Sequence, residues 1–131
     1  MSCVLVVDDQ SILREVIADL LREFEMADEV FEAKNLKVAC SIMQEQQLIG
    51  IVTDMNLADG NMLDLIANMQ QNGYTLPPTV LLSGFLSEKS IRRAKELGIK
   101  VVLDKPLRPD ILLEKIEKLL MHHKDLDAAG L

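Results

Sequence analysis

The stretch Leu48-Ile49-Gly50-Ile51-Val52-Thr53-Asp54-Met55-Asn56-Leu57-Ala58-Asp59-Gly60 joins an apolar run to a carboxylate and then to a turn-forming pair. A short apolar run bounded by turn signals predicts a strand that is buried on both faces. Asp54 would then stand at the carboxyl end of this strand, where open parallel sheets bind their ligands. We therefore take Asp54 as the first candidate for a functional residue.

Other short apolar runs alternate along the chain with patterns of helical period. The runs cover residues 3–7, 79–82 and 101–103, with a weaker one over 30–33, and the helical patterns cover 12–24, 36–43, 62–69, 88–97 and 109–120. This alternation predicts a parallel sheet with helices on both faces, because right-handed crossovers place them there. The predicted fold class is α/β, a doubly wound five-stranded parallel sheet, flavodoxin-like, with strand order 2-1-3-4-5.

Side chains at the ends of these helical patterns suit capping. Ser11, or the acidic pair before it, is a candidate cap for the first helix, and Asn35 and Ser87 for the second and fourth. Gly98 is placed to end the fourth helix, and Pro109 suits the first turn of the last. We expect one domain over residues 1–121, followed by a frayed polar tail over residues 122–131.

Composition excludes several classes of protein. A chain of 131 residues with 49% hydrophobic residues is long enough for one globular domain. The net charge of −7 argues against direct binding of nucleic acid, which requires clustered positive charge. No apolar run approaches the length of a membrane span, and the N-terminus lacks the pattern of a secretory signal. Cys3 and Cys40, with no CxxC spacing, are expected to be buried thiols in a cytoplasmic protein.

Polar side chains follow four of the predicted strands. Asp8 and Asp9 follow the first strand, Asp54 ends the third, Ser83 ends the fourth and Lys105 follows the fifth. Because the carboxyl ends of parallel strands lie at one edge of the sheet, these residues are expected to gather there. Several carboxylates in one crevice repel one another, and a divalent cation would relieve that repulsion. Oxygen ligands that leave room for water and phosphate suit Mg²⁺.

Such an edge suits the transfer of a phosphoryl group to Asp54. Phosphoryl transfer depends mostly on positioning and charge neutralisation, which the cation and Lys105 would provide. An aspartate is already ionised near neutral pH, so Asp54 would need no general base as a nucleophile.

Four motifs in this order resemble the receiver domain of two-component response regulators, the CheY-like family. They are Val6-Val7-Asp8-Asp9-Gln10-Ser11, the stretch from Asp54 to Gly60, Leu81-Leu82-Ser83-Gly84 and Asp104-Lys105-Pro106-Leu107, within a resemblance over residues 3–121. The resemblance implies a stand-alone phospho-acceptor signalling module rather than a conventional enzyme, catalysing only its own phosphorylation and dephosphorylation. It also implies a histidine kinase or phosphotransfer protein as donor. A downstream target protein would bind through the fourth helix, fifth strand and fifth helix.

The resemblance also implies roles for individual residues. Asp54 matches the phospho-accepting aspartate, and Mg²⁺ would be held by Asp9 directly, by Asp8 as its outer acidic partner, by Asp54 and by the backbone carbonyl of Asn56. Ser83 matches the switch hydroxyl and Lys105 the lysine that pairs with the phosphate. The bond between Lys105 and Pro106 is commonly cis in this family.

Some positions depart from the family pattern. Ala58 stands where proline is frequent, Met62 and Gly84 replace the usual glycine and alanine, and Val102 occupies the place of an aromatic residue that commonly turns inward on activation. The departures at Ala58, Met62 and Val102 motivate an alternative, a degenerate receiver that binds or dimerises without phosphorylation. A phosphatase of the haloacid-dehalogenase type is a weaker alternative, because Gln10 stands where its second acidic residue is expected.

Overall fold

The computed structural model describes residues 2–105 and 108–128, with the side chains of residues 121–128 excepted. The main strands are β1 (Cys3–Val7), β2 (Glu29–Ala33), β3 (Gly50–Asp54), β6 (Thr79–Ser83) and β7 (Val101–Asp104), and two short strands are β4 (Asn56–Leu57) and β5 (Gly60–Asn61). The helices are α1 (Ser11–Glu23), α2 (Leu36–Glu45), α3 (Met62–Gln71), α4 (Glu88–Glu96) and α5 (Pro109–Ala128). Within this described part, no helix is both long and apolar enough to cross a bilayer.

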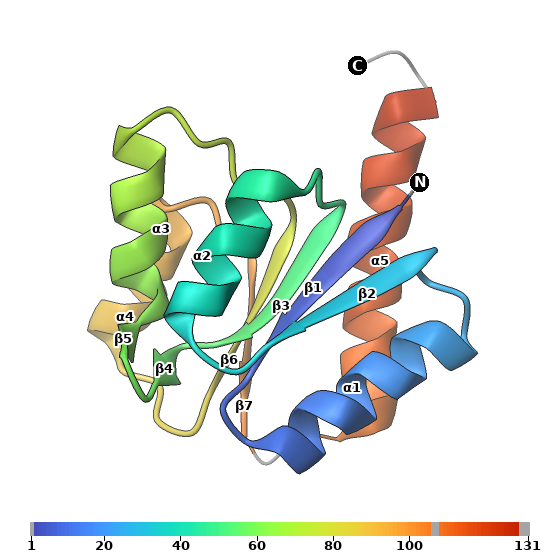
Figure 1. Cartoon of the computed structure of the whole chain (residues 1–131), viewed down its shortest axis with the longest axis horizontal. Coiled ribbons are helices and arrows are strands. Elements are labelled where there is room, and N and C mark those ends of the chain that lie inside the picture. Colours follow the sequence, from blue (N-terminus) through green and yellow to red (C-terminus); the bar gives the residue numbers. More distant parts are fainter. Residues whose placement is uncertain (1, 106–107, 129–131) are drawn as a thin grey trace.

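The main sheet has the predicted topology. Its five strands lie in the order β2-β1-β3-β6-β7, and all of its neighbouring strands are parallel (Figure 1). Counting only these five strands along the chain, the order is 2-1-3-4-5, as predicted. The register pairs Val7 of β1 with Thr53 of β3, so the residues that follow these strands emerge side by side.

Helices cover both faces of the sheet, and each face has its own apolar core. Side chains of α2, α3 and α4 pack on one face around Leu5, Ile51 and Leu81. Side chains of α1 and α5 pack on the other face around Val6 and Val52. Alternate residues of one strand thus point into different cores, which explains why the central strands are apolar throughout rather than at every second position.

Most of the predicted helix ends are confirmed. The side chain of Asn35 accepts a hydrogen bond from Val38 N, and that of Ser87 accepts one from Ser90 N. Gly98 has a φ of +92° and follows α4, where a left-handed residue ends a helix at little cost. The prediction for Ser11 is wrong, because Ser11 is the first helical residue and the N-cap is Gln10, whose side chain makes no capping bond.

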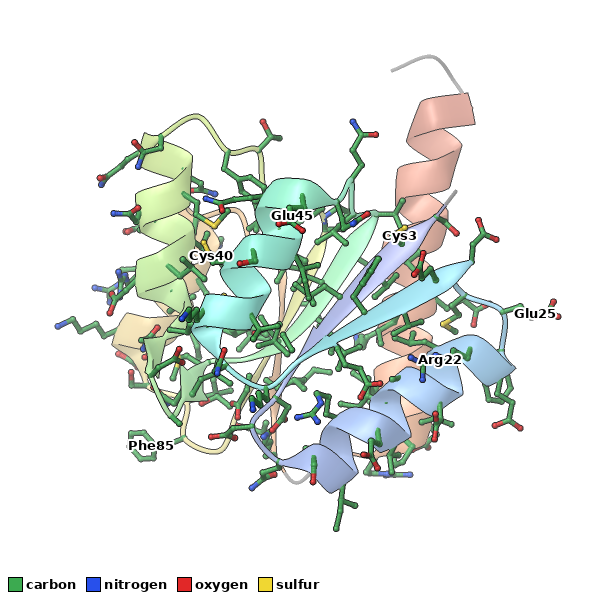
Figure 2. The ribbon with its side chains drawn as sticks, viewed as in Figure 1. Cys3, Arg22, Glu25, Cys40, Glu45 and Phe85 are labelled. Carbon is green, nitrogen blue, oxygen red and sulfur yellow. The ribbon has the colours of Figure 1, made fainter. Side chains whose placement is uncertain are left out.

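Three features differ from the expectations. An antiparallel hairpin, β4–β5, stands between β3 and α3, where only a turn was predicted. Helix α5 continues to Ala128, so its backbone covers most of the segment expected to fray. Cys3 and Cys40 are free, but only Cys3 is buried and Cys40 is partly exposed on α2 (Figure 2). The expected cis bond before Pro106 lies outside the described residues.

Candidate functional site

Three carboxylates meet at the carboxyl edge of the sheet. Asp8 follows β1, Asp9 comes next, and Asp54 is the last residue of β3. One oxygen from each of these side chains lies within 4.8 Å of the others, and Asp8 and Asp54 are buried whereas Asp9 is exposed. The neighbouring positions of β1 and β3 at the centre of the sheet produce this cluster, as the sequence predicted.

Lys105 bridges the two buried carboxylates. Its Nζ lies 3.0 Å from Asp8 Oδ2 and 3.1 Å from Asp54 Oδ2, and the lysine side chain is mostly buried. The backbone of Lys105 is held by a bond from its N–H to the carbonyl of Ser83, at the end of β6. Side chains from the ends of β1, β3 and β7 therefore form one charged group, in which three carboxylates face one ammonium.

A network that the sequence did not reveal holds Asp8 in place. Asp8 N donates to the carbonyl of Ala33, and Asp8 Oδ1 accepts a 2.8 Å bond from Gln10 N. Arg14 Nη1 donates a 2.8 Å bond to the carbonyl of Asp8, while Arg14 Nε pairs with Glu32 at 3.3 Å. Arg14 has no local signal of this role, because it sits at an ordinary polar position of an amphipathic helix.

Burial and charge shift the pKa values of this group. The pKa of Asp54 is raised, chiefly by burial and further by the negative charge of Asp8. The hydrogen bond and charge of Lys105, and a backbone hydrogen bond from Met55, lower this pKa but do not outweigh the rise. For Lys105, burial by itself lowers the pKa, but hydrogen bonds and charge from Asp8 and Asp54 outweigh it, so the net shift is upward. The site thus favours a charged lysine and leaves the Asp54 carboxylate poorly stabilised.

Ser83 lies at the same edge, but its hydroxyl is engaged elsewhere. Ser83 is buried, and its Oγ donates a 2.8 Å bond to the carbonyl of Phe85 and accepts a 3.2 Å bond from Phe85 N. The hydroxyl therefore closes a tight turn in the β6–α4 loop. The Phe85 side chain is 79% exposed and points away from the fold (Figure 2).

Asn56 occupies the first position of the hairpin, two residues after Asp54. It pairs with Asn61 across the hairpin, and Asn61 Nδ2 donates a 3.4 Å bond to Asn56 Oδ1. The amide side chain of Asn56 is thus turned toward its hairpin partner. The ligand role predicted for Asn56 uses its backbone carbonyl and does not need this side chain.

The residues of the cluster fit a hard divalent cation. All side-chain donors of Asp8, Asp9 and Asp54 are oxygens, which is the donor set that Mg²⁺ prefers. A single lysine leaves a net negative charge of about two in the group, by simple counting of ionised side chains. Three protein carboxylates would leave coordination places for water and for phosphate oxygens.

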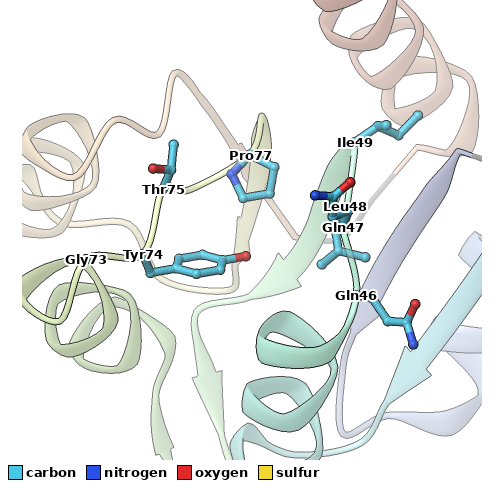
Figure 3. Close-up of a pocket in the computed structure, with 8 residues that line it drawn as sticks. All are labelled: Gln46, Gln47, Leu48, Ile49, Gly73, Tyr74, Thr75 and Pro77. Atoms are coloured by element: carbon cyan, nitrogen blue, oxygen red, sulfur yellow. The ribbon is translucent and has the colours of Figure 1, made fainter.

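One hollow on the described surface lies away from this cluster. It has a volume of about 480 Å³ and is lined by Gln46–Ile49 and by Gly73, Tyr74, Thr75 and Pro77 (Figure 3). These segments precede β3 and β6, so the hollow is at the amino edge of the sheet, opposite the carboxylates. It shares no residue with the acidic group, and we assign it no part in the chemistry.

Known proteins have the same fold and a similar sequence. Residues 4–117 match the family described as response regulator receiver domain. A chemotaxis protein CheY homolog of Campylobacter jejuni is 27% identical over 118 residues, covering 88% of this chain and 90% of the relative. The chemotaxis protein CheY1 of Helicobacter pylori is 25% identical over 117 residues, covering 88% and 94%. The crystal structure of a CheY-like receiver domain protein from Methanospirillum hungatei superposes with a TM-score of 0.83 at 22% identity, covering 95% and 98%.

The fold and topology place the chain in the class of flavodoxin-like, CheY-like α/β domains. Within that class, the match over most of its length shows that the chain belongs to the response regulator receiver domains. Members of this family are signalling modules in which phosphoryl acceptance is typical, and they interact with histidine kinases and downstream targets.

Proposed function

We propose that the protein accepts a phosphoryl group on Asp54 from a phosphohistidine of a histidine kinase or phosphotransfer protein, in a Mg²⁺-dependent reaction. One observation carries the proposal: Lys105 Nζ lies 3.1 Å from Asp54 Oδ2, beside two further carboxylates at the carboxyl edge of the sheet. Family membership adds support, because phosphoryl acceptance is typical of receiver domains.

Each residue of the site has a distinct task in the proposed reaction. A carboxylate oxygen of Asp54 forms a bond to phosphorus while the bond from phosphorus to the histidine nitrogen breaks, and the released imidazole takes up a proton from water. Lys105 pairs with a phosphoryl oxygen in place of its present bond to Asp54. Asp8, Asp9, Asp54 and the backbone carbonyl of Asn56 would hold the cation, which would supply positive charge to neutralise the transferring group.

The signal would leave the site through the β6–α4 loop. To reach a phosphoryl oxygen, the Ser83 hydroxyl must give up its bond to the Phe85 carbonyl, so phosphorylation and the present loop conformation compete for one donor. Val102 is half-buried on β7 and supplies no aromatic ring that could move together with the Ser83 hydroxyl. The proposed target surface is formed by α4, β7 and α5, where Ile91 and Ile111 are exposed.

Incubation with Mg²⁺ and a small phosphodonor tests the acceptor directly. Intact mass spectrometry should show an increase of one phosphate in the wild type and in Asp104→Asn, which neutralises an exposed carboxylate at the same edge. Asp54→Asn and omission of Mg²⁺ should both abolish the increase. A wild type that gains no phosphate from small donors or from a kinase would refute the proposal.

The degenerate-receiver alternative makes a different prediction. If the chain acts only as a binding module, a partner captured from the source cell should bind equally well without Mg²⁺ and with Asp54→Asn. If our proposal is right, binding of the target should depend on both.

A cytoplasmic location is part of the same proposal and is supported by the free state of Cys3 and Cys40.

A further inference from the structure

The hairpin β4–β5 connects the acidic site to helix α2. It begins two residues after Asp54, and its first residue is Asn56. Its strands pair Asn56 with Asn61 and Leu57 with Gly60, so Ala58 and Asp59 form the turn. A hairpin of this size has too few backbone bonds to fix its own position, because even longer isolated hairpins are marginally stable.

Asp59 attaches the tip of this hairpin to the start of α2. Its carboxylate accepts a 2.9 Å bond from Leu36 N and a 3.2 Å bond from Lys37 N, across 23 and 22 positions of sequence. These N–H groups belong to the first turn of the helix, which has no intrahelical acceptors for them. A carboxylate also interacts favourably with the positive end of the helix dipole. The pKa of Asp59 is lowered, chiefly by the hydrogen bond from Leu36 N, which favours the charged carboxylate.

Apolar contacts hold the hairpin at the same place. Leu57 is buried in the core beneath α2 and α3, and Leu36 packs against that core. Gly60 has a φ of +145°, and a Cβ there would stand 3.0 Å from Leu36 Cδ1. A side chain at position 60 would therefore press against Leu36, so glycine lets the hairpin lie close to the start of α2.

The base of the hairpin is attached to the site. Met55 N donates to the carbonyl of Leu82 on β6, and Met62 N donates a 2.8 Å bond to the carbonyl of Met55. The backbone between these anchors contains Asn56, and the bonds of Asp59 attach the far end of the hairpin to α2. Loss of these bonds would remove the polar attachment to α2 and leave the burial of Leu57 as the contact that holds the hairpin on that side.

We propose that Asp59 is a positioning residue, which fixes the backbone of Asn56 beside Asp54 by attaching the hairpin to α2 and so sets the affinity of the site for its divalent cation. The inference rests on the proposed Mg²⁺ site. Asp59 itself touches neither the cation nor the phosphoryl group, since its carboxylate is bound to the helix.

The chain offers a matched control for this role. Asn35 caps the same helix by accepting from Val38 N, but it makes this bond from the helix side and is not part of the hairpin. Asn35→Ala and Asp59→Ala both weaken the start of α2, whereas only Asp59→Ala releases the tip of the hairpin from this helix. Asp59→Asn retains one acceptor oxygen and should lie between the wild type and Asp59→Ala.

Titration calorimetry with MgCl₂ tests the inference. We expect Asp59→Ala to raise the dissociation constant on the order of 10-fold, the lower end of the effect of outer residues at metal sites. Asn35→Ala should leave it within about twofold, since it disturbs no group near the cation. The Mg²⁺ concentration for half-maximal phosphorylation should rise in parallel, while the rate at saturating Mg²⁺ should be retained.

Different outcomes separate this inference from the proposed function. Unchanged Mg²⁺ affinity in Asp59→Ala, or an equal loss in Asn35→Ala, would overturn the positioning role while leaving the acceptor role intact. Failure of the wild type to bind Mg²⁺ would overturn both. Amide chemical shifts of Asn56 that change in Asp59→Ala, but not in Asn35→Ala, would support the role independently of activity.

Discussion

Replacement of Asp54 by asparagine should stabilise the protein at neutral pH in the absence of Mg²⁺. The substitution keeps the shape of the side chain and one oxygen that can accept from Lys105, but it removes a charge from a buried position. The charged carboxylate of the proposed acceptor would thus lower the free energy of unfolding of the protein.

The magnitude follows from the distances in the site. Repulsion between Asp54 and Asp8, whose oxygens lie within 4.8 Å, is about 3.5 kcal/mol at an effective dielectric constant of about 20. Attraction between Asp54 and Lys105 at 3.1 Å is about 5 kcal/mol on the same basis. Asp9 adds further repulsion, which water weakens because Asp9 is exposed. These contributions nearly cancel, so the cost of burying the charge decides the sign, and we expect a gain of about 1–2 kcal/mol.

The pH dependence of the gain has a defined direction. The folded-state pKa of Asp54 lies above its ordinary value of 3.8, so the wild type loses stability as pH rises from 3.8 through the folded-state pKa. Asparagine does not titrate. The difference between the two proteins should therefore be small below pH 3.8, grow through this window and stay constant above it.

Urea unfolding followed by far-ultraviolet circular dichroism suits this chain, which has no tryptophan. A gain of 1–2 kcal/mol would move the midpoint by roughly 0.5–1 M urea. Mg²⁺ should narrow the difference, because it binds and stabilises the wild type more. Asp104→Asn is the control and should change stability by less than about 0.5 kcal/mol, because its carboxylate is exposed. If Asp54→Asn is less stable than the wild type at pH 7 without Mg²⁺, the reasoning about burial is wrong.

Further predictions concern local features of the fold. Glu25 has a φ of +53°, so Glu25→Gly should relieve backbone strain and raise the free energy of unfolding by about 1 kcal/mol, measured in urea. Ile66 is fully buried, and Ile66→Ala should lower that free energy by about 3 kcal/mol in the same assay; a loss below about 1 kcal/mol would contradict the packing described here. The pKa of Asp59 is lowered by its bonds to α2, so the stability lost in Asp59→Ala should be full above pH 3.8 and diminish as pH falls further. Thermal unfolding of the wild type and of Asp59→Ala, from neutral pH down to about pH 2, would check this prediction. A loss of stability that is equally large at the lowest pH would contradict it.

The sheet and its acidic edge could be predicted because their signals are local. Four of the five main strands are short apolar runs, β2 with Glu29 and Glu32 being the weaker signal, and the run that ends at Asp54 needs no distant information to be identified. Once five such strands alternate with helices, parallel topology brings Asp8, Asp54 and Lys105 to one edge. The contacts from Lys105 to both carboxylates are a detail of this same prediction.

The sequence did not predict some contacts, because they join residues that are far apart in the chain or because one polar group could bond to either of two partners. The bonds of Asp59 join it to a helix 22 and 23 positions earlier, and nothing in an Asp-Gly turn indicates that partner. Ser83 was correctly placed at the sheet edge, but its hydroxyl can serve a bound anion or its own loop equally well. In this structure it bonds to Phe85, which a strand-end position does not predict. Arg14 contacts the carbonyl of Asp8 only because the first helix turn brings it over β1 and β2.

The bridge made by Lys105 has a consequence for how the protein folds. Its bonds to Asp8 and Asp54 span 97 and 51 positions, so they are among the last contacts that a growing chain can form. During synthesis the first three strands can associate before β7 has emerged, and their carboxylates then face one another without the lysine. The mutual repulsion of these carboxylates opposes the association of the central strands until β7 brings the ammonium of Lys105 between them. Docking of the last strand therefore neutralises part of the charge that the earlier strands have gathered.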